Sequence, residues 1–157
     1  MQLKEITMTV MDSIELNNEM YRRNFSKTEK AMDVRELIPK HKDDQEVIVG
    51  LKKLSFEEIQ PIVPDLLEWL QDLHWPIARP VAEVLEPFSD KLVPDLLEIL
   101  KTNDGMWKFG ILVTFGRTTK DQTLLKEIER IAKFPTRDEI EEEVNLEAIS
   151  ILNGEYS

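Results

Sequence analysis

The segments VPDLLEWL, residues 63–70, and VPDLLEIL, residues 93–100, are two copies of one eight-residue block. Seven of the eight positions are identical at an offset of 30 residues, and only Trp69 and Ile99 differ. A weaker third copy follows 28 residues later, with apolar residues at the matching positions Leu124, Leu125 and Ile128. Self-similarity at a period of about 20–50 residues is typical of stacked repeat proteins. The sequence therefore predicts a short stack of helical hairpins.

The leucines of the block have the spacing of a buried helix face. Positions i, i+3, i+4 and i+7 of a helix lie on one side, and apolar residues occupy these positions in both copies. We therefore expect the following side chains to lie between helices: Leu66, Leu67, Leu70, Leu96, Leu97 and Leu100.

Capping and turn residues divide the remainder of the chain into helices. Three pairs match the capping-box pattern, in which a Ser or Thr is followed three residues later by Glu or Gln: Ser55 with Glu58, Thr119 with Gln122, and Thr136 with Glu139. Helices are predicted at about 45–54, 106–115, 120–134 and 137–152, in addition to those that contain the blocks. The total is seven or eight helices with short loops, so the fold class is all-α.

The first 32 residues do not share the periodicity of the repeats. Leu3, Ile6, Val10 and Ile14 have helical spacing, whereas Ile6, Met8 and Val10 alternate as in a strand. We interpret residues 1–32 as an N-terminal extension, partly helical, and residues 33–157 as the helical-repeat domain.

Several segments resemble a known family of small, mostly bacterial proteins. They are 36–40 (ELIPK), 51–55 (LKKLS), 63–85 (VPDLLEWLQDLHWPIARPVAEVL), 100–104 (LKTND), 106–108 (MWK), 127–132 (EIERIA) and 135–136 (PT). The family is a domain of unknown function with a HEAT-like helical fold, and the resemblance covers about residues 34–152. It implies a fold only: a short right-handed α-α superhelix of about three HEAT-like hairpins.

The charge of the chain is negative and unevenly distributed. The net charge is −11, and residues 41–100 contain 13 acids against 5 lysines and arginines. An acidic surface disfavours phosphate backbones and favours encounter with a basic protein. Solubility alone is the other explanation of such a charge. The chain has no cysteine and no apolar run long enough for a membrane span, so we expect a cytoplasmic protein that binds neither nucleic acid nor membranes.

No catalytic or metal-binding pattern emerges from the residue types. His41 and His74 lie in different loops without a histidine or acid at the i+4 spacing of a metal site, and we expect His74 to be a partly buried turn residue. The acids of residues 138–143 fit the first turns of a helix, where they favour its dipole, and we interpret them as a solvated face. We therefore expect no cofactor, no metal and no enzymatic activity.

The candidate binding residues are aromatic and basic side chains near the repeat turns: Trp69, Trp75, Arg79, Trp107 and Lys108. Tryptophan and arginine are enriched at the energetic centres of protein interfaces. The alternative is that the tryptophans fill the core between repeats while Arg79 pairs with a nearby glutamate. We expect Trp75 to be more exposed than Trp107, because Trp107 begins an apolar run.

These observations favour a non-enzymatic protein-interaction module, of the immunity type if its partner is a basic toxin. One alternative is a HEAT-like enzyme or nucleic-acid-handling protein, against which the acidic charge of residues 41–100 argues. Another is a small scaffold or regulator of a metabolic complex. The sequence leaves the choice of partner and the oligomeric state open.

Overall fold

The computed structural model describes residues 33–157, so the predicted partial helicity of residues 1–32 lies outside the described residues. Within this range, Leu37–Ser157 forms one compact unit. The unit consists of helices and turns, and no strand occurs among residues 33–157. The all-α class predicted from the block is therefore confirmed.

The helices follow one another with short connections. A 3-10 turn at Val34–Leu37 is followed by α2 (Glu46–Leu51), α3 (Phe56–Ile59), α4 (Val63–Glu68), α5 (Ala78–Leu85), α6 (Ser89–Leu100), α7 (Gly105–Thr114), α8 (Gln122–Lys133), α9 (Arg137–Glu141) and α10 (Val144–Leu152). Further 3-10 turns lie at Gln60–Ile62, Glu86–Phe88 and Gly116–Thr118.

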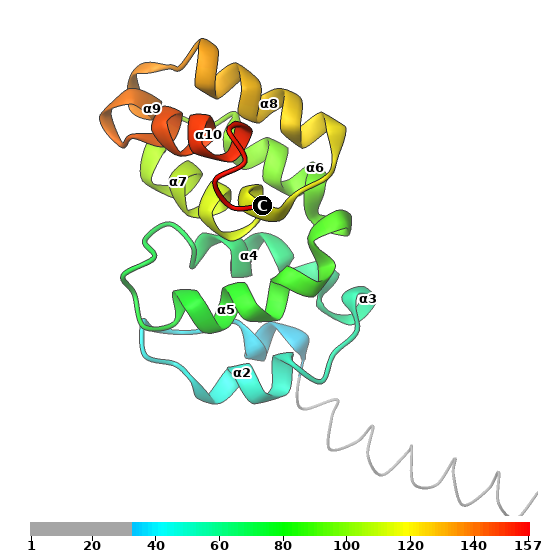
Figure 1. Cartoon of the computed structure of the whole chain (residues 1–157). Coiled ribbons are helices and arrows are strands. Elements are labelled where there is room, and N and C mark those ends of the chain that lie inside the picture. The colour runs from blue at the N-terminus through cyan, green and yellow to red at the C-terminus, as the bar shows by residue number, and fades with distance from the viewer. Residues whose placement is uncertain (1–32) are drawn as a thin grey trace, which may run out of the picture. The chain divides into compact units, whose positions relative to one another are not determined.

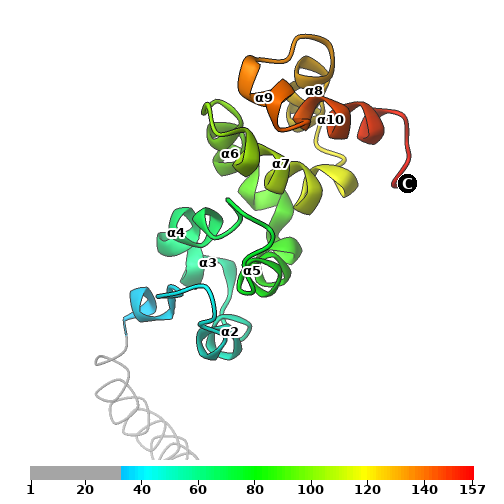
Figure 2. The same ribbon diagram turned by 90° about the vertical axis from the view of Figure 1, so that its left-hand side faces the viewer.

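Within residues 37–157 the helices lie in successive layers (Figures 1 and 2). Helix α2 is followed by the pair α4 and α5, then by α6 and α7, and then by α8 with α9 and α10. Contacts between α2 and α5, between α6 and α8, and between α7 and α10 connect neighbouring layers. The two copies of the block thus lie in α4 and α6, in adjacent layers.

The block leucines form the centre of the core. Five of the six predicted side chains are buried, namely Leu66, Leu67, Leu70, Leu96 and Leu100, whereas Leu97 is half-buried. Burying a leucine side chain contributes about 1.5–3 kcal/mol to stability. The burial prediction is confirmed at the five positions and is only partly met at Leu97.

The two copies differ in the backbone that precedes them. In the second copy α6 runs without interruption from Ser89 to Leu100, with Pro94 inside it. In the first copy the equivalent stretch is split into α3, a 3-10 turn and α4. Pro61 stands in that turn where the second copy has Lys91. Proline lacks an N–H and clashes with the preceding turn. Two prolines three residues apart, Pro61 and Pro64, therefore interrupt the helix of the first copy, whereas α6 accommodates Pro94 alone.

The residues at two of the three predicted capping boxes behave as expected. Ser55 with Glu58 caps α3, and Thr136 with Glu139 caps α9. The third prediction is wrong. Asp121 is the N-cap of α8 and accepts a hydrogen bond from the Leu124 N–H at 2.9 Å, while Thr119 Oγ1 accepts from the Asp121 N–H. A carboxylate two residues closer to the first turn takes the place of the threonine.

The predicted single helix over 137–152 is broken into two. Helix α9 ends at Glu141, and α10 begins after Glu143, which has a left-handed backbone with φ of 58°. Glu143 is the only residue other than glycine with positive φ in the described part of the chain. The break turns α10 back to pack on α8 and α7.

Two glycines allow α7 to lie close to its neighbours. A Cβ atom at Gly105 would lie 2.3 Å from the Asp138 carbonyl oxygen, and one at Gly110 would lie 2.3 Å from the Leu70 carbonyl oxygen. Only a residue without a side chain fits at either distance. These contacts position the start of α7 against α9 and its middle against the end of the first block.

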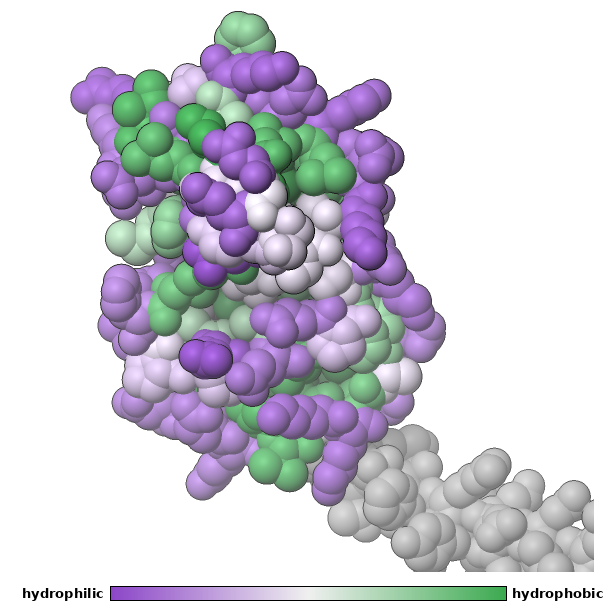
Figure 3. All heavy atoms as spheres, viewed as in Figure 1, coloured by the Kyte–Doolittle hydropathy of each residue, from purple (hydrophilic) through white to green (hydrophobic). Residues whose placement is uncertain are grey.

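The last helix exposes apolar side chains on its outer face. Leu146, Ile149 and Leu152 are 52%, 39% and 43% exposed, and Figure 3 shows apolar residues gathered over the α9–α10 end. Among residues 33–157, no helix has both the length and the apolar character needed to cross a membrane.

Candidate functional site

Two of the predicted binding residues, Trp69 and Trp75, contact each other. Their rings meet edge to face with centroids 5.7 Å apart, and Lys42 Nζ lies 5.3 Å from the Trp75 ring centroid. Both tryptophans are half-buried. The two rings pack against each other in the turn between α4 and α5. Much of their surface therefore contacts the protein itself and is not free for a partner.

Arg79 lies on α5 and is exposed. Its Nε is 3.5 Å from Glu83 Oε1 one helical turn away, which is a weak surface ion pair. Arg79 lines a hollow of about 370 Å³ together with Leu73, Glu86 and Arg117. The residues of this hollow include neither Trp69 nor Trp75, so the predicted set does not form one patch.

Lys108 was expected at a binding surface, and this expectation needs correction. The residue is 1% exposed, and its Nζ donates a hydrogen bond to Glu139 Oε2 at 3.0 Å. Its Nζ also lies 2.9 Å from Asp138 Oδ2, without the alignment of a hydrogen bond. Lys108 therefore stabilises the contact between α7 and α9, and its ammonium group is not available to a partner.

Glu139 is the centre of this buried ion-pair network. The residue is fully buried, and besides Lys108 it accepts hydrogen bonds from Arg130 at 2.7 and 2.9 Å and from the Thr136 N–H at 2.8 Å. Burial alone would raise the pKa of Glu139, but the hydrogen bonds from Arg130, Thr136 and Lys108 outweigh it and lower the pKa to about 2. The interpretation of residues 138–143 as a solvated face is therefore wrong for Glu139.

Trp107 is held in place by its own N–H groups. Its indole Nε1 donates to the Leu67 carbonyl oxygen at 2.9 Å, and its backbone N–H donates to Asp104 Oδ1 at 3.0 Å. The Leu67 carbonyl lies in the last turn of α4 and also accepts a hydrogen bond from the Leu70 N–H at 3.0 Å, so the indole is a second donor to it. The ring is half-buried and separates two hollows of the surface.

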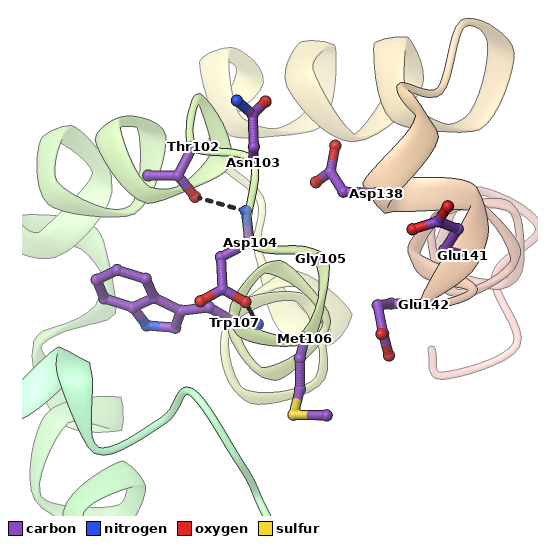
Figure 4. Close-up of a pocket in the computed structure, with 9 residues that line it drawn as sticks. All are labelled: Thr102, Asn103, Asp104, Gly105, Met106, Trp107, Asp138, Glu141 and Glu142. Atoms are coloured by element: carbon purple, nitrogen blue, oxygen red, sulfur yellow. Dashed lines mark hydrogen bonds between the residues drawn. The ribbon is translucent and has the colours of Figure 1, made fainter.

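The first hollow, which we call the acidic hollow, lies between the turn before α7 and helix α9. It has a volume of about 470 Å³. Figure 4 shows Asp138, Glu141 and Glu142 across the hollow from Asp104, which precedes α7, and from Trp107, in the first turn of α7. Thr102, Asn103, Gly105 and Met106 complete its lining.

The second hollow, which we call the repeat groove, lies between the two copies of the block. Helix α4 contributes Pro64, Leu67 and Glu68, and helix α6 contributes Asp95, Glu98 and Ile99. Trp107 closes one side, and the volume is about 300 Å³. The acidic hollow and the repeat groove share Trp107, and we call the two together the Trp107 face.

The Trp107 face is strongly acidic. Among the described residues that line it, seven are acids and none is a lysine or an arginine. Three of the acids have a cation partner: Glu98 pairs with Lys101, Asp138 with Lys108, and Glu141 with Arg137. The other four, Glu68, Asp95, Asp104 and Glu142, form no ion pair with residues 33–157. The face therefore retains negative charge that a basic partner would neutralise.

The histidines are not assembled into a site. His74 was expected to be partly buried, but its side chain is 98% exposed, and its Nδ1 lies 3.1 Å from Asp72 Oδ1. His41 Nδ1 accepts a hydrogen bond from the Asp43 N–H. Within residues 33–157, no group of three or more histidines, aspartates and glutamates is arranged to hold a metal ion.

The sequence contained a signal for the Trp107 face that motif analysis missed. Glu68 and Glu98 occupy the same position of the two block copies, 30 residues apart. Stacking adjacent repeats places equivalent positions side by side, so these acids had to line one surface. The position of Trp107 against the block depends on the bond to Leu67, which no local pattern predicts.

The fold and the site together define an all-helical domain with an acidic, partly aromatic surface. A model of the family described as "Domain of unknown function (DUF5071)" matches residues 37–152, so the chain belongs to this family. No curated protein matches the chain.

Proposed function

We propose that the chain is a non-enzymatic protein-interaction module that binds a basic protein through the Trp107 face. Its architecture would be a short right-handed superhelix of about three HEAT-like hairpins. The layered arrangement of α4 to α10 and the recurrence of the block in adjacent layers support this architecture.

The observation that carries the proposal is the position of Trp107 between two acid-lined hollows. A half-buried tryptophan held by two hydrogen bonds offers a large contact area at little entropic cost on binding. Tryptophan is among the residues most enriched at the energetic centres of interfaces. Surrounding carboxylates accelerate the encounter with a cationic partner and repel phosphate backbones.

The partner class is a basic protein. A cationic toxin that the module neutralises, as immunity proteins do, is one form of this class. Neutralisation of that kind requires fast association, which an acidic face supplies by electrostatic steering. The four carboxylates without an ion pair within the described residues are the groups available for this steering.

The test is affinity capture from a lysate of the source organism with three matched proteins. The first is the wild type, and the second carries Glu68→Lys and Glu142→Lys on the Trp107 face. The third carries Glu46→Lys and Glu155→Lys, two exposed acids outside it, and has the same net charge as the second. We expect the wild type and the third protein to retain the same basic protein, and the second to retain at least tenfold less. Equal capture by all three, or capture of nucleic acid instead, would contradict the proposal.

A further inference from the structure

The repeat groove differs from the acidic hollow in having an apolar floor. Leu67 and Ile99 are 1% and 6% exposed, and the ring of Trp107 closes the side. Pro64 adds a further apolar wall at the start of α4. An apolar side chain that entered this groove would be removed from water and would contact carbon atoms on several sides.

Acids form the rim of the same groove. Glu68 and Glu98 are exposed, and Asp95 is half-buried. Glu98 pairs with Lys101 at 3.2 Å, but both side chains are mostly exposed, so a partner's cation can replace Lys101 at little cost. Glu68 and Asp95 form no ion pair within residues 33–157. An apolar floor with a negative rim is complementary to an apolar side chain that has cationic neighbours.

We propose that the repeat groove binds one large apolar side chain of a basic protein segment, whose flanking lysines or arginines pair with Glu68, Asp95 and Glu98. This inference rests on the proposed function and specifies which part of the Trp107 face receives the partner and by which chemistry. The groove is built by both copies of the block, so the repetition itself creates the binding element.

The size and lining of the groove favour this occupant over a metabolite. A volume of about 300 Å³ is at the lower end of the range for pockets that bind small molecules, about 300–1,000 Å³. Phosphates and carboxylates are repelled by the rim, and among the described residues of the lining the charged side chains are all acids. The exposed apolar face of α10 is a second apolar surface, but nothing in the structure identifies what covers it.

The test is an NMR titration of the full chain with three peptides that differ only in their central five residues. Their central sequences are Lys-Lys-Leu-Lys-Lys, Lys-Lys-Ser-Lys-Lys and Glu-Glu-Leu-Glu-Glu. The chain has three tryptophans, so its spectrum contains three indole N–H signals, and Trp107→Phe identifies the one that donates to Leu67. This signal reports directly on the wall of the groove.

We expect the first peptide to shift the Trp107 indole signal and to leave those of Trp69 and Trp75 unchanged. Replacing leucine by serine should weaken binding at least about tenfold, because the apolar contribution is lost. The acidic peptide should not bind. In the double variant Glu68→Gln/Glu98→Gln, which keeps the side-chain shape, binding of the first peptide should weaken and lose most of its salt dependence.

Three outcomes would overturn the inference. They are equal affinity for the leucine and serine peptides, shifts that centre on Ile149 of α10 instead of Trp107, and no shift at millimolar peptide. The proposed function is tested separately by the capture experiment. A basic protein that the Glu68→Lys/Glu142→Lys variant no longer captures, but that leaves the Trp107 indole signal unmoved, would support the proposed function and refute the groove.

Discussion

The indole Nε1 of Trp107 donates a 2.9 Å hydrogen bond to the carbonyl oxygen of Leu67, 40 residues earlier in the chain. This bond joins the start of α7 to the end of α4 and fixes the ring at the boundary between the acidic hollow and the repeat groove. The same residue therefore contributes to stability and shapes the surface that we propose for binding.

Replacing Trp107 by phenylalanine should lower the free energy of unfolding by about 1–3 kcal/mol. The substitution removes one of the two hydrogen bonds that the Leu67 carbonyl accepts, and it removes part of the ring contact. Trp69→Phe is the matched control, because Trp69 is also half-buried. Urea denaturation of both variants measures the difference, and equal losses of stability would contradict a specific contribution of the Trp107 bond.

Gly110→Ala should destabilise the protein by about 1–3 kcal/mol. The new Cβ atom would lie 2.3 Å from the Leu70 carbonyl oxygen, so α7 must move away from the first block. Gly50→Ala in α2 is the control, because its Cβ would meet the movable side chain of Leu37 at 3.0 Å. In that helix alanine should be neutral or stabilising by up to about 1 kcal/mol. A Gly110→Ala protein with wild-type melting temperature would show that the close approach is not required.

Lys108→Met should cost about 3 kcal/mol of stability. The apolar side chain fills similar space but leaves Asp138 without its cation and removes one donor from the buried Glu139. Lys133→Met removes an exposed ion pair with Glu129 and should cost less than about 1 kcal/mol. The comparison is made by chemical denaturation, and similar costs at the two lysines would mean that the buried network adds little to stability.

The stability of the protein should fall as the pH drops from about 4.5 toward 2. The pKa of Glu139 is lowered from 4.5 to about 2 in the folded state. The unfolded chain therefore binds a proton before the folded chain does, and the stabilisation present above pH 4.5 is lost as the pH approaches 2. The full loss from this group amounts to roughly 3 kcal/mol.

Glu139→Gln isolates this contribution. The variant should be less stable at neutral pH, and its stability should change less steeply between pH 4.5 and 2 than that of the wild type. Some slope should remain, because the pKa of Asp138 is also lowered. Burial raises this pKa, but the hydrogen bond from Thr136 and the neighbouring Lys108 ammonium outweigh that effect. An unchanged slope in the variant would mean that Glu139 is not the dominant acid-sensitive group.

The helical class and most of the core follow from the sequence because they depend on local periodicity. The leucine spacing identifies a buried face, and Ser55 and Thr136 identify helix starts, since both signals act within one or two turns. The break after α9 was missed because Glu143 adopts a left-handed backbone, which is uncommon for glutamate. The packing of α10 against α8 and α7 stabilises that backbone conformation, and a local sequence pattern does not predict this packing.

The candidate site was less predictable than the fold. Trp107 and Lys108 are both candidates from the sequence, but the structure leaves Trp107 half-buried between two hollows and places Lys108 in the interior. Adjacent residues on a helix point about 100° apart, so one can face solvent while the next meets Glu139. The ion partners of Lys108 lie 30 and 31 residues away. At this separation the order of charges in the sequence does not indicate which residues pair.

The central claim is that a basic protein binds at the Trp107 face. The most direct test is photo-crosslinking with a photoreactive amino acid placed at Glu98 on the rim of the repeat groove, and in a second protein at Glu155. We predict a covalent adduct with a basic protein from position 98 that added salt suppresses, and no such adduct from position 155. An adduct that forms equally at both positions, or only at position 155, would contradict the claim.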